Sequence, residues 1–359
     1  MASVVVVGGG YGGITVAGGL DEVADVTLIE QKDQFVHHAA VDSVWGHTIF
    51  MPYSRLLKRG KIVHGTAMRV EGTTVYVAGQ DPIEGDYLVL ATGTTYPFPA
   101  KHQVSQAAVA KARLDQCRAN LANANRVLLV GAGTVGVEFA GEISATFPDL
   151  QIIMVDRAPH ILGTPGYSQE LIDDLTRQLK DRGVELVLGA PLAYMPPSDM
   201  GVLSSFYVET TDGVGIEADM WFICYGARTA TGYFHGAYSE LLHGDGTIMV
   251  NEYMQVRGTQ NVYAVGDITD VPESKRADAA RAHARVVVAN IKDQLANRAP
   301  STTYSPGKEW IVLPLGPDGG ASQLVTPQGK MALVGPEETA EIKGSDLMVT
   351  MIRGQLHLP

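Results

Sequence analysis

The sequence has few of the features that mark disulfide-bonded or membrane-anchored proteins. It contains two cysteines, Cys117 and Cys224, which are too far apart and too few for a disulfide framework, so we expect a reducing compartment. No apolar run reaches the length of a membrane-spanning helix. Because Ala2 and not glycine follows Met1, we also expect no N-myristoyl anchor. These absences predict a cytoplasmic protein.

Excess basic charge is also missing, since the net charge is −12. This balance argues against a nucleic-acid partner and against electrostatic docking on an anionic membrane. With 359 residues and 45% hydrophobic residues, the chain is long and apolar enough for two or three packed domains. Glycine is abundant, and many of the glycines fall in a few tight clusters.

The first glycine cluster, Gly8–Gly13, lies between a predicted strand and a predicted helix. The valine-rich run Ser3–Val7 precedes it, and a helix-compatible stretch follows to about Leu20. Asp25–Ile29 then forms a second buried strand that ends at Glu30. The order strand, glycine turn, helix, strand predicts a βαβ unit.

This turn has the spacing that a dinucleotide diphosphate requires. Gly8 permits the tight turn, Gly10 lets the backbone approach the phosphate, and Gly13 lets the helix lie close to the strand. Glu30 follows 22 residues after Gly8, where its carboxylate can accept hydrogen bonds from ribose hydroxyls.

The same pattern returns later in the chain. The strand Arg126–Val130 leads into Gly131–Gly136, and a helix over Val137–Thr146 follows. The strand Gln151–Val155 then ends at Asp156, which lies 25 residues after Gly131. Two such units predict two nucleotide-binding domains in one chain.

Acidic residues near the second turn bear on cofactor choice and on catalysis. Asp156 favours a free 2′-hydroxyl and so NADH over NADPH, although the adjacent Arg157 leaves NADPH open. Glu138 has two interpretations. It is either a structural carboxylate, favourably placed near a helix N-terminus, or a functional one that lies near the nicotinamide and orients the hydride donor or relays a proton. Glu142 lies one turn further along this helix, and we expect it to be structural.

A third element decides which dinucleotide each unit binds. The buried strand Asn261–Val265 ends in Gly266-Asp267, and a helix over about Ala277–Asn297 follows. Gly266-Asp267 alone is compatible with a plain turn. With the N-terminal unit, however, Asp267 is placed to accept a hydrogen bond from the ribitol of FAD, and the helix points its positive end at the flavin.

The motif order therefore predicts an α/β fold with two Rossmann-like dinucleotide-binding domains and a small C-terminal α+β domain. We expect a discontinuous FAD-binding domain over 1–105 and 245–303, an NAD(P)H-binding domain over 106–244 and a C-terminal domain over 304–359.

Together these motifs resemble the two-domain flavoprotein reductases of the glutathione-reductase type, and within them the apoptosis-inducing-factor-like branch of NAD(P)H:quinone reductases. The resemblance covers nearly the whole chain and is weakest after Lys308. It rests on the glycine turns and on Lys32–His38, Tyr53-Ser54, Ala91-Thr92-Gly93, Pro97-Phe98-Pro99, Gly136-Val137-Glu138, Val250-Asn251-Glu252, Asn261–Asp267 and His283-Ala284 with Ala289-Asn290-Ile291.

The resemblance implies non-covalent FAD, reduction by NADH with NADPH as an alternative, and transfer of two electrons to a small quinone-like acceptor. It implies that Ala67 lends its backbone to the adenine and that Ala91–Gly93 lie along the cofactor. The candidate cofactor-binding residues are Gly8, Gly10, Tyr11, Gly12, Gly13, Glu30, Gln31, Lys32, Ala67, Ala91, Thr92, Gly93, Gly131, Gly133, Thr134, Val135, Gly136, Asp156, Arg157, Gly226, Gly266, Asp267 and Ala277.

The chain departs from this pattern in two places. The cysteine pair of the disulfide reductases is absent, so electrons must pass from the flavin directly to the acceptor. The segment between His38 and Val41 is shorter than the pattern. The candidate catalytic residues are Glu138 and His38. We expect no metal at His37 and His38, because no further ligand lies at a suitable spacing, and a flavin-edge hydrogen bond from His38 instead.

Three functions remain open on the sequence alone. The first is an NADH-dependent quinone reductase, with Trp45, Phe50 and Trp310 as candidates for an apolar acceptor site. The second is a tailoring or electron-transfer flavoprotein that reduces a metabolite or a small redox protein. The third is a redox-gated scaffold that senses NADH.

Overall fold

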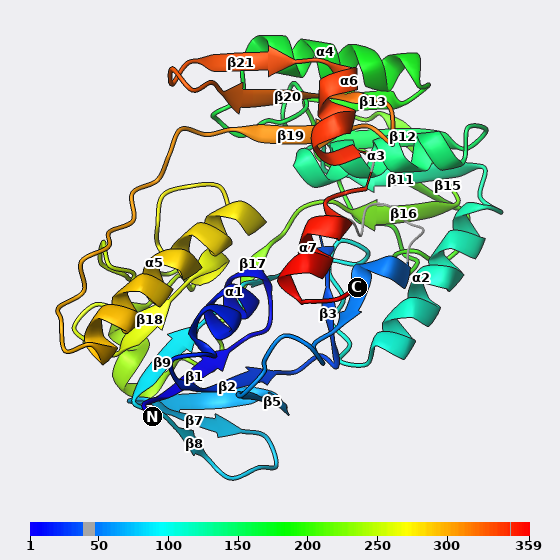
Figure 1. Ribbon diagram of the computed structural model, residues 1–359. Coiled ribbons are helices and arrows are strands. Elements are labelled where there is room, and N and C mark those ends of the chain that lie inside the picture. Colours follow the sequence, from blue (N-terminus) through cyan, green and yellow to red (C-terminus); the bar gives the residue numbers. More distant parts are fainter. Residues whose placement is uncertain (39–46, 345) are drawn as a thin grey trace.

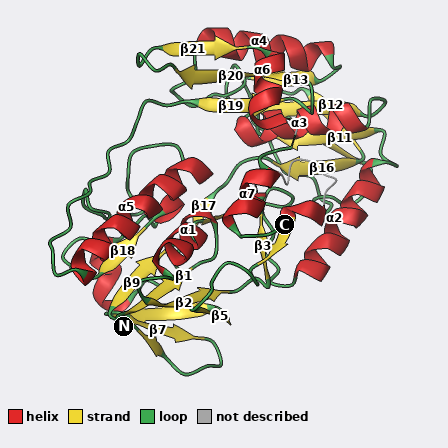
Figure 2. Ribbon diagram, in the orientation of Figure 1, coloured by secondary structure: helices red, strands yellow, loops and turns green. Residues whose placement is uncertain are grey.

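The computed structural model describes residues 1–38, 47–344 and 346–359. Two parallel sheets with helices packed against them form most of the molecule, and a small antiparallel sheet lies beside the second (Figure 1). Figure 2 shows the same layers coloured by secondary structure.

The first sheet is built from segments at both ends of the chain. Its strands are parallel and lie in the order β18-β9-β1-β2-β5. The bounds are β1 Ser3–Val7, β2 Asp25–Glu30, β5 Lys61–His64, β9 Tyr87–Leu90 and β18 Val262–Ala264. Helices α1 (Tyr11–Leu20) and α5 (Ala277–Leu295) pack against each other beside it. The valines of β1 are buried because neighbouring elements cover both faces of this central strand.

The second sheet has the order β13-β12-β11-β16 and is also parallel. Its strands are β11 Arg126–Val130, β12 Gln151–Asp156, β13 Glu185–Leu188 and β16 Met220–Ile223, and its helices are α2 Ala107–Leu121, α3 Thr134–Thr146 and α4 Gln169–Asp181. Helix α3 begins three residues earlier than the sequence predicted, because Gly133 is its N-cap and glycine in the first turn weakens the helical signal.

The C-terminal segment begins as a sheet beside the second sheet and ends beside the first. Strands β19 Ile311–Pro314, β20 Gly320–Val325 and β21 Met331–Val334 form an antiparallel sheet that contacts α3 and α4. Helix α6 (Pro336–Thr339), a π-helical turn over Ala340–Gly344 and α7 (Val349–Gln355) follow. Ile352 and Leu356 are buried in the same core as β1, so α7 returns to the first sheet, next to α1 (Figure 1).

The remaining elements are short. They are β3 Gln34–Val36, β4 Phe50–Pro52, β6 Ala67–Glu71, β7 Thr74–Val77, β8 Ile83–Glu84, β10 Thr94–Thr95, β14 Phe206–Glu209, β15 Gly215–Ala218 and β17 Arg228–Thr229, with 3-10 turns at His47–Ile49, Gly236–Leu241 and Gly266–Ile268. The pairing of β10 with β17 links the segments that leave the two parallel sheets. None of the described helices is long and apolar enough to cross a bilayer.

Candidate functional site

The first glycine turn lies at the carboxyl edge of the first sheet. Strand β1 ends at Val7, which pairs with Ile29 and Leu90, so Gly8, Glu30 and Ala91 meet at one edge. Gly8 has a φ of +102°, and a Cβ there would lie 2.5 Å from the Ala91 carbonyl oxygen. The start of the segment Ala91–Gly93 therefore passes directly beside the turn.

The glycines within this turn have two different physical reasons. A Cβ on Gly13 would lie 1.7 Å from the Gly8 carbonyl oxygen, so only glycine lets α1 approach β1 this closely. A Cβ on Gly10, in contrast, would meet no described atom within 4 Å. Gly10 is the N-cap of α1 and no side chain caps it. This opening, at a helix N-terminus, fits a dinucleotide diphosphate.

Glu30 and Tyr53 hold the turn in place. Glu30 Oε2 accepts a hydrogen bond from Gly9 N at 2.5 Å, and Oε1 accepts one from Lys32 N at 2.8 Å. Tyr53 Oη donates to the Gly9 carbonyl oxygen at 2.9 Å. Gly65 N donates to the Glu30 carbonyl oxygen at 3.0 Å, which brings the start of β6 and Ala67 near the same edge. The sequence motifs included Tyr53 but assigned it no role.

The second glycine turn repeats the geometry. Gly131 has a φ of +116°, and a Cβ on Gly136 would lie 2.0 Å from the Gly131 carbonyl oxygen. Gly133, the N-cap of α3, faces no described atom within 4 Å of an added Cβ. Gly226 lies three residues beyond the end of β16, at the same edge of the second sheet. The space before Thr134 and Val135 therefore fits a second diphosphate.

Asp156 lies at the end of β12, beside this turn. Its Oδ2 accepts a hydrogen bond from Ala132 N at 2.7 Å, and its Oδ1 accepts one from Ala158 N at 2.8 Å. Arg157 follows and is exposed. Asp156 thus keeps acceptor capacity near the space where an adenosine ribose would lie.

Gly266 and Asp267 lie at the end of β18, between the first sheet and the start of α5 at Ala277. Asp267 Oδ2 accepts a hydrogen bond from Thr94 Oγ1 at 2.7 Å. Gly266 N donates to His283 Nδ1 at 3.0 Å. The other ring nitrogen, Nε2, donates to Glu273 Oε1 at 2.7 Å, so the neutral ring orients the turn. His283 belonged to the sequence motifs without a role.

A cluster of bases lies near Asp267. We call Lys32, His38, Lys101 and His102 the basic cluster. Lys101 Nζ donates to Thr94 Oγ1 at 2.6 Å and lies 3.7 Å from Asp267 Oδ2. Burial lowers the pKa of Lys101, lowers that of His102 to about 4 and holds that of His38 well below its usual range. The two histidines are therefore neutral at pH 7, and the positive charge of the cluster that favours an anion comes from Lys32 and Lys101.

Glu138 meets a residue that the sequence analysis did not identify. The ammonium of Lys343, in the π-helical turn of the C-terminal segment, donates to Glu138 Oε1. The two side chains are 13% and 14% exposed, so water screens this ion pair only weakly. Burial raises the pKa of Glu138, and the Lys343 charge opposes that rise.

His37 connects the first glycine turn to the C-terminal segment. Its Nε2 donates to the Leu347 carbonyl oxygen at 2.6 Å, and Nδ1 accepts from Tyr11 Oη at 2.8 Å. Leu347 and Met348 both adopt positive φ angles, 52° and 64°, which side chains other than glycine seldom take. The His37 ring thus holds a strained segment that follows Lys343.

The apolar candidates for an acceptor site are not assembled in the described structure. Phe50, the first residue of β4, is buried against α2, whereas Trp310 lies beneath the Arg276 guanidinium, with 4.7 Å between Arg276 Cζ and the ring centroid. Trp45 and Val41 lie outside the described residues. Within the described ranges, no group of three or more histidine, cysteine or acidic residues is arranged to hold a metal ion.

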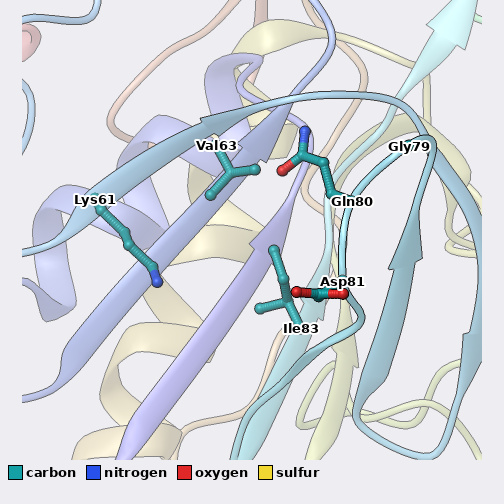
Figure 3. Close-up of a pocket in the computed structure, with 6 residues that line it drawn as sticks. All are labelled: Lys61, Val63, Gly79, Gln80, Asp81 and Ile83. Carbon is teal, nitrogen blue, oxygen red and sulfur yellow. The ribbon is translucent and has the colours of Figure 1, made fainter.

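An open groove lies between β5 of the first sheet and the segment Gly79–Ile83 (Figure 3). It is lined by Lys61, Val63, Gly79, Gln80, Asp81 and Ile83. Lys61 pairs with Thr27, three residues before Glu30. Val63, the other lining residue of this strand, pairs with Ile29, so the groove extends to within one residue of the carboxyl edge.

Comparisons with known proteins agree with this geometry. The family model of the pyridine nucleotide-disulphide oxidoreductases matches residues 2–284. Ferroptosis suppressor protein 1 of Mus musculus is 30% identical over 89% of this chain and 88% of its own length. Apoptosis-inducing factor homolog B of Dictyostelium discoideum is 29% identical over 99% of this chain and 97% of its own length.

Solved structures support the fold alone. The sulfide:quinone oxidoreductase of Aquifex aeolicus superposes with a TM-score of 0.77 at 17% identity, covering 99% of this chain and 91% of that one. The water-forming NADH oxidase of Lactobacillus brevis, bound to NADH, gives 0.71 at 21% identity, covering 90% and 75%. The two parallel sheets described above thus have the Rossmann-type α/β architecture of these oxidoreductases.

Proposed function

Because the chain belongs to the pyridine nucleotide-disulphide oxidoreductase family, we propose that it transfers hydride from NADH to FAD and then two electrons directly to a quinone-type acceptor. Its cofactors are FAD and NAD(P)H. One observation carries the proposal: two glycine turns open at the carboxyl edges of two separate parallel sheets, with a buried carboxylate, Glu138, on the helix after the second turn.

The first turn is the proposed FAD site. The open space at Gly10 accommodates the diphosphate, Glu30 accepts hydrogen bonds from the adenosine ribose, and Asp267 accepts one from the ribitol. We also propose that FAD contacts Gln31, Lys32, Ala67, Ala91–Gly93 and Ala277. Lys32 and Lys101 of the basic cluster stabilise the negative charge that the bound flavin gains on reduction, and the neutral His38 ring offers the flavin edge a hydrogen bond.

The second turn is the proposed NAD(P)H site. The space before Thr134 accommodates the diphosphate, and Gly226 lines the opposite side. Asp156 repels a 2′-phosphate, so NADH is the preferred donor and Arg157 makes NADPH a weaker one. Glu138, held by Lys343, orients the nicotinamide and is placed to relay a proton through its carboxylate.

Direct transfer to the acceptor follows from the cysteine positions. Cys117 lies in α2 and Cys224 follows β16; both are buried and neither forms a disulfide. Burial raises the pKa of the Cys117 thiol to about 12, so it is a thiol and not a nucleophilic thiolate at neutral pH. No dithiol relay is available, and the acceptor takes electrons from the flavin itself.

The domain boundaries follow from the same assignment. We propose that 1–105 with 245–303 bind FAD, that 106–244 bind NAD(P)H and that 304–359 cover the flavin. The lower sheet strands in Figure 1 come from the first set and the upper parallel strands from the second. A cytoplasmic location remains part of the proposal.

Anaerobic stopped-flow spectroscopy tests the function. NADH should bleach the flavin absorbance faster than NADPH does, and a water-soluble quinone should restore it with turnover. The matched control is Gly133→Val, which fills the space at the second turn. It should retain yellow FAD and respond to a chemical reductant but not to NADH. Bleaching without quinone turnover would refute the acceptor, and a protein that takes up no FAD would refute the whole assignment.

A further inference from the structure

A line of ionisable side chains runs from the protein surface to the Glu138–Lys343 pair. Asp318 is 82% exposed at its outer end, and it pairs with Arg182, at the end of α4, at 3.4 Å. Arg182 lies close enough to Glu142 to act on its charge. Glu142 is 8% exposed, and it lies one helical turn after Glu138 on α3.

The charges in this line do not cancel. Glu138 and Glu142 are two buried carboxylates, whereas Lys343 is the only ammonium paired with either of them among the described residues. Arg182 is shared with Asp318. Two like charges one turn apart in a buried site disfavour double ionisation, so the group retains a proton near neutral pH.

The pKa of Glu142 agrees with this excess of buried carboxylates over paired cations. Burial raises its pKa to about 7, and the Glu138 carboxylate adds to that rise, while Lys343 and Arg182 oppose it. A carboxyl that titrates near neutral pH can both take up and release a proton under working conditions.

We propose that Glu142 is a proton relay that carries a solvent proton to the Glu138–Lys343 pair during reduction of the acceptor. The inference rests on the proposed function. Two-electron reduction of a quinone consumes two electrons and two protons. NADH supplies two electrons and one proton as hydride, so each turnover draws one more proton from water.

In the relay, the Glu142 carboxyl gives its proton to the Glu138 carboxylate, which passes it to the reduced acceptor. Glu142 then regains a proton from water at the exposed end of the line, beside Arg182. The sum is NADH plus one proton plus quinone, giving NAD⁺ and hydroquinone, and no further oxidant or reductant is needed.

The test compares acceptors that need protons with one that does not. Glu142→Gln keeps the size and polarity of the side chain but carries no transferable proton. Quinone reduction should fall by at least about tenfold, the lower part of the range for lost acid–base catalysis. Ferricyanide takes electrons without protons, so its reduction should be unchanged, as should the bleaching of the flavin by NADH. Glu142→Asp, which can still carry a proton, should recover part of the quinone activity.

An equilibrium measurement tests whether Glu142 is protonated, independently of which acceptor the protein reduces. Infrared difference spectra of the holoenzyme should show a carboxylic-acid band that titrates near pH 7 and is absent in Glu142→Gln. If the parent reduces no quinone but shows this band, the proposed acceptor is wrong and the protonated Glu142 stands. Equal losses with quinone and ferricyanide, or a variant that retains the band, would overturn the relay.

Discussion

Glu142→Gln should make the protein more stable, and increasingly so as the pH rises. The folded-state pKa of Glu142 is raised to about 7 from its usual 4.5. The folded protein therefore binds more protons than the unfolded chain between these values, and the parent loses stability as the pH rises through this window. Glutamine does not titrate, so the variant escapes this loss.

The size of this stability difference follows from the rise in the pKa of Glu142. About 1.4 kcal/mol for each pKa unit converts a rise from 4.5 to about 7 into about 3 kcal/mol. Glu142 is 8% exposed, so solvent screening reduces this little. Parent and variant should thus differ by less than about 1 kcal/mol at pH 5 and by up to about 3 kcal/mol at pH 8. In a protein of this size the melting temperature should differ by about 5 °C or more.

The assay is thermal unfolding of the FAD-saturated protein at several pH values between 5 and 8. Glu185→Gln is the matched control, because Glu185 is an exposed carboxylate in the second sheet, and its profile should run parallel to that of the parent. If Glu142→Gln also runs parallel to the parent, the carboxyl is ionised throughout the window. The charge count behind the proton relay would then be wrong.

Four further changes test other parts of the site. Gly10→Val should yield colourless protein that takes up no FAD on reconstitution, because the side chain fills the diphosphate space; a yellow variant would contradict this. Asp156→Asn should raise the NADPH-to-NADH ratio of kcat/KM by about tenfold or more, since a charge-assisted hydrogen bond contributes about 1.5–3 kcal/mol; an unchanged ratio would place the ribose elsewhere. Lys343→Met should lower kcat for flavin reduction by NADH without releasing FAD, because it leaves Glu138 buried and unpaired; full activity would exclude the pair from the chemistry. His37→Gln, which can still reach the Leu347 carbonyl, should retain more activity than His37→Asn, which cannot; equal kcat values would show that the contact is dispensable.

The parts of the site that could be predicted from sequence are local. The first turn, its helix and Glu30 lie within one βαβ unit, where sterics require glycine at Gly13, which cannot carry a side chain against the Gly8 carbonyl, and an approaching phosphate requires it at Gly10. The second unit follows the same rules. Helix boundaries were less certain where glycine occurs in the first turn, as at the start of α3.

The parts that could not be predicted are contacts between distant segments. Lys343 follows Glu138 by 205 residues, and Leu347 follows His37 by 310. Nothing in the local pattern of Ala340–Gly344 distinguishes its lysine from a solvated one. Helical spacing placed Glu142 one turn from Glu138, but spacing gives neither its burial nor the shortage of cations around it.

The charges near the two turns have opposite consequences for the proposed chemistry. Beside Asp267, the ammonium groups of Lys32 and Lys101 stabilise negative charge where the flavin would lie. On α3, acids outnumber the one paired ammonium, so a proton is retained. Reduction of a quinone requires both an electron pair and a proton at one place. Because Lys343 belongs to the C-terminal segment, the position of that segment determines how many of the acids on α3 are ionised. Its position therefore determines whether the proton is present when the electrons leave.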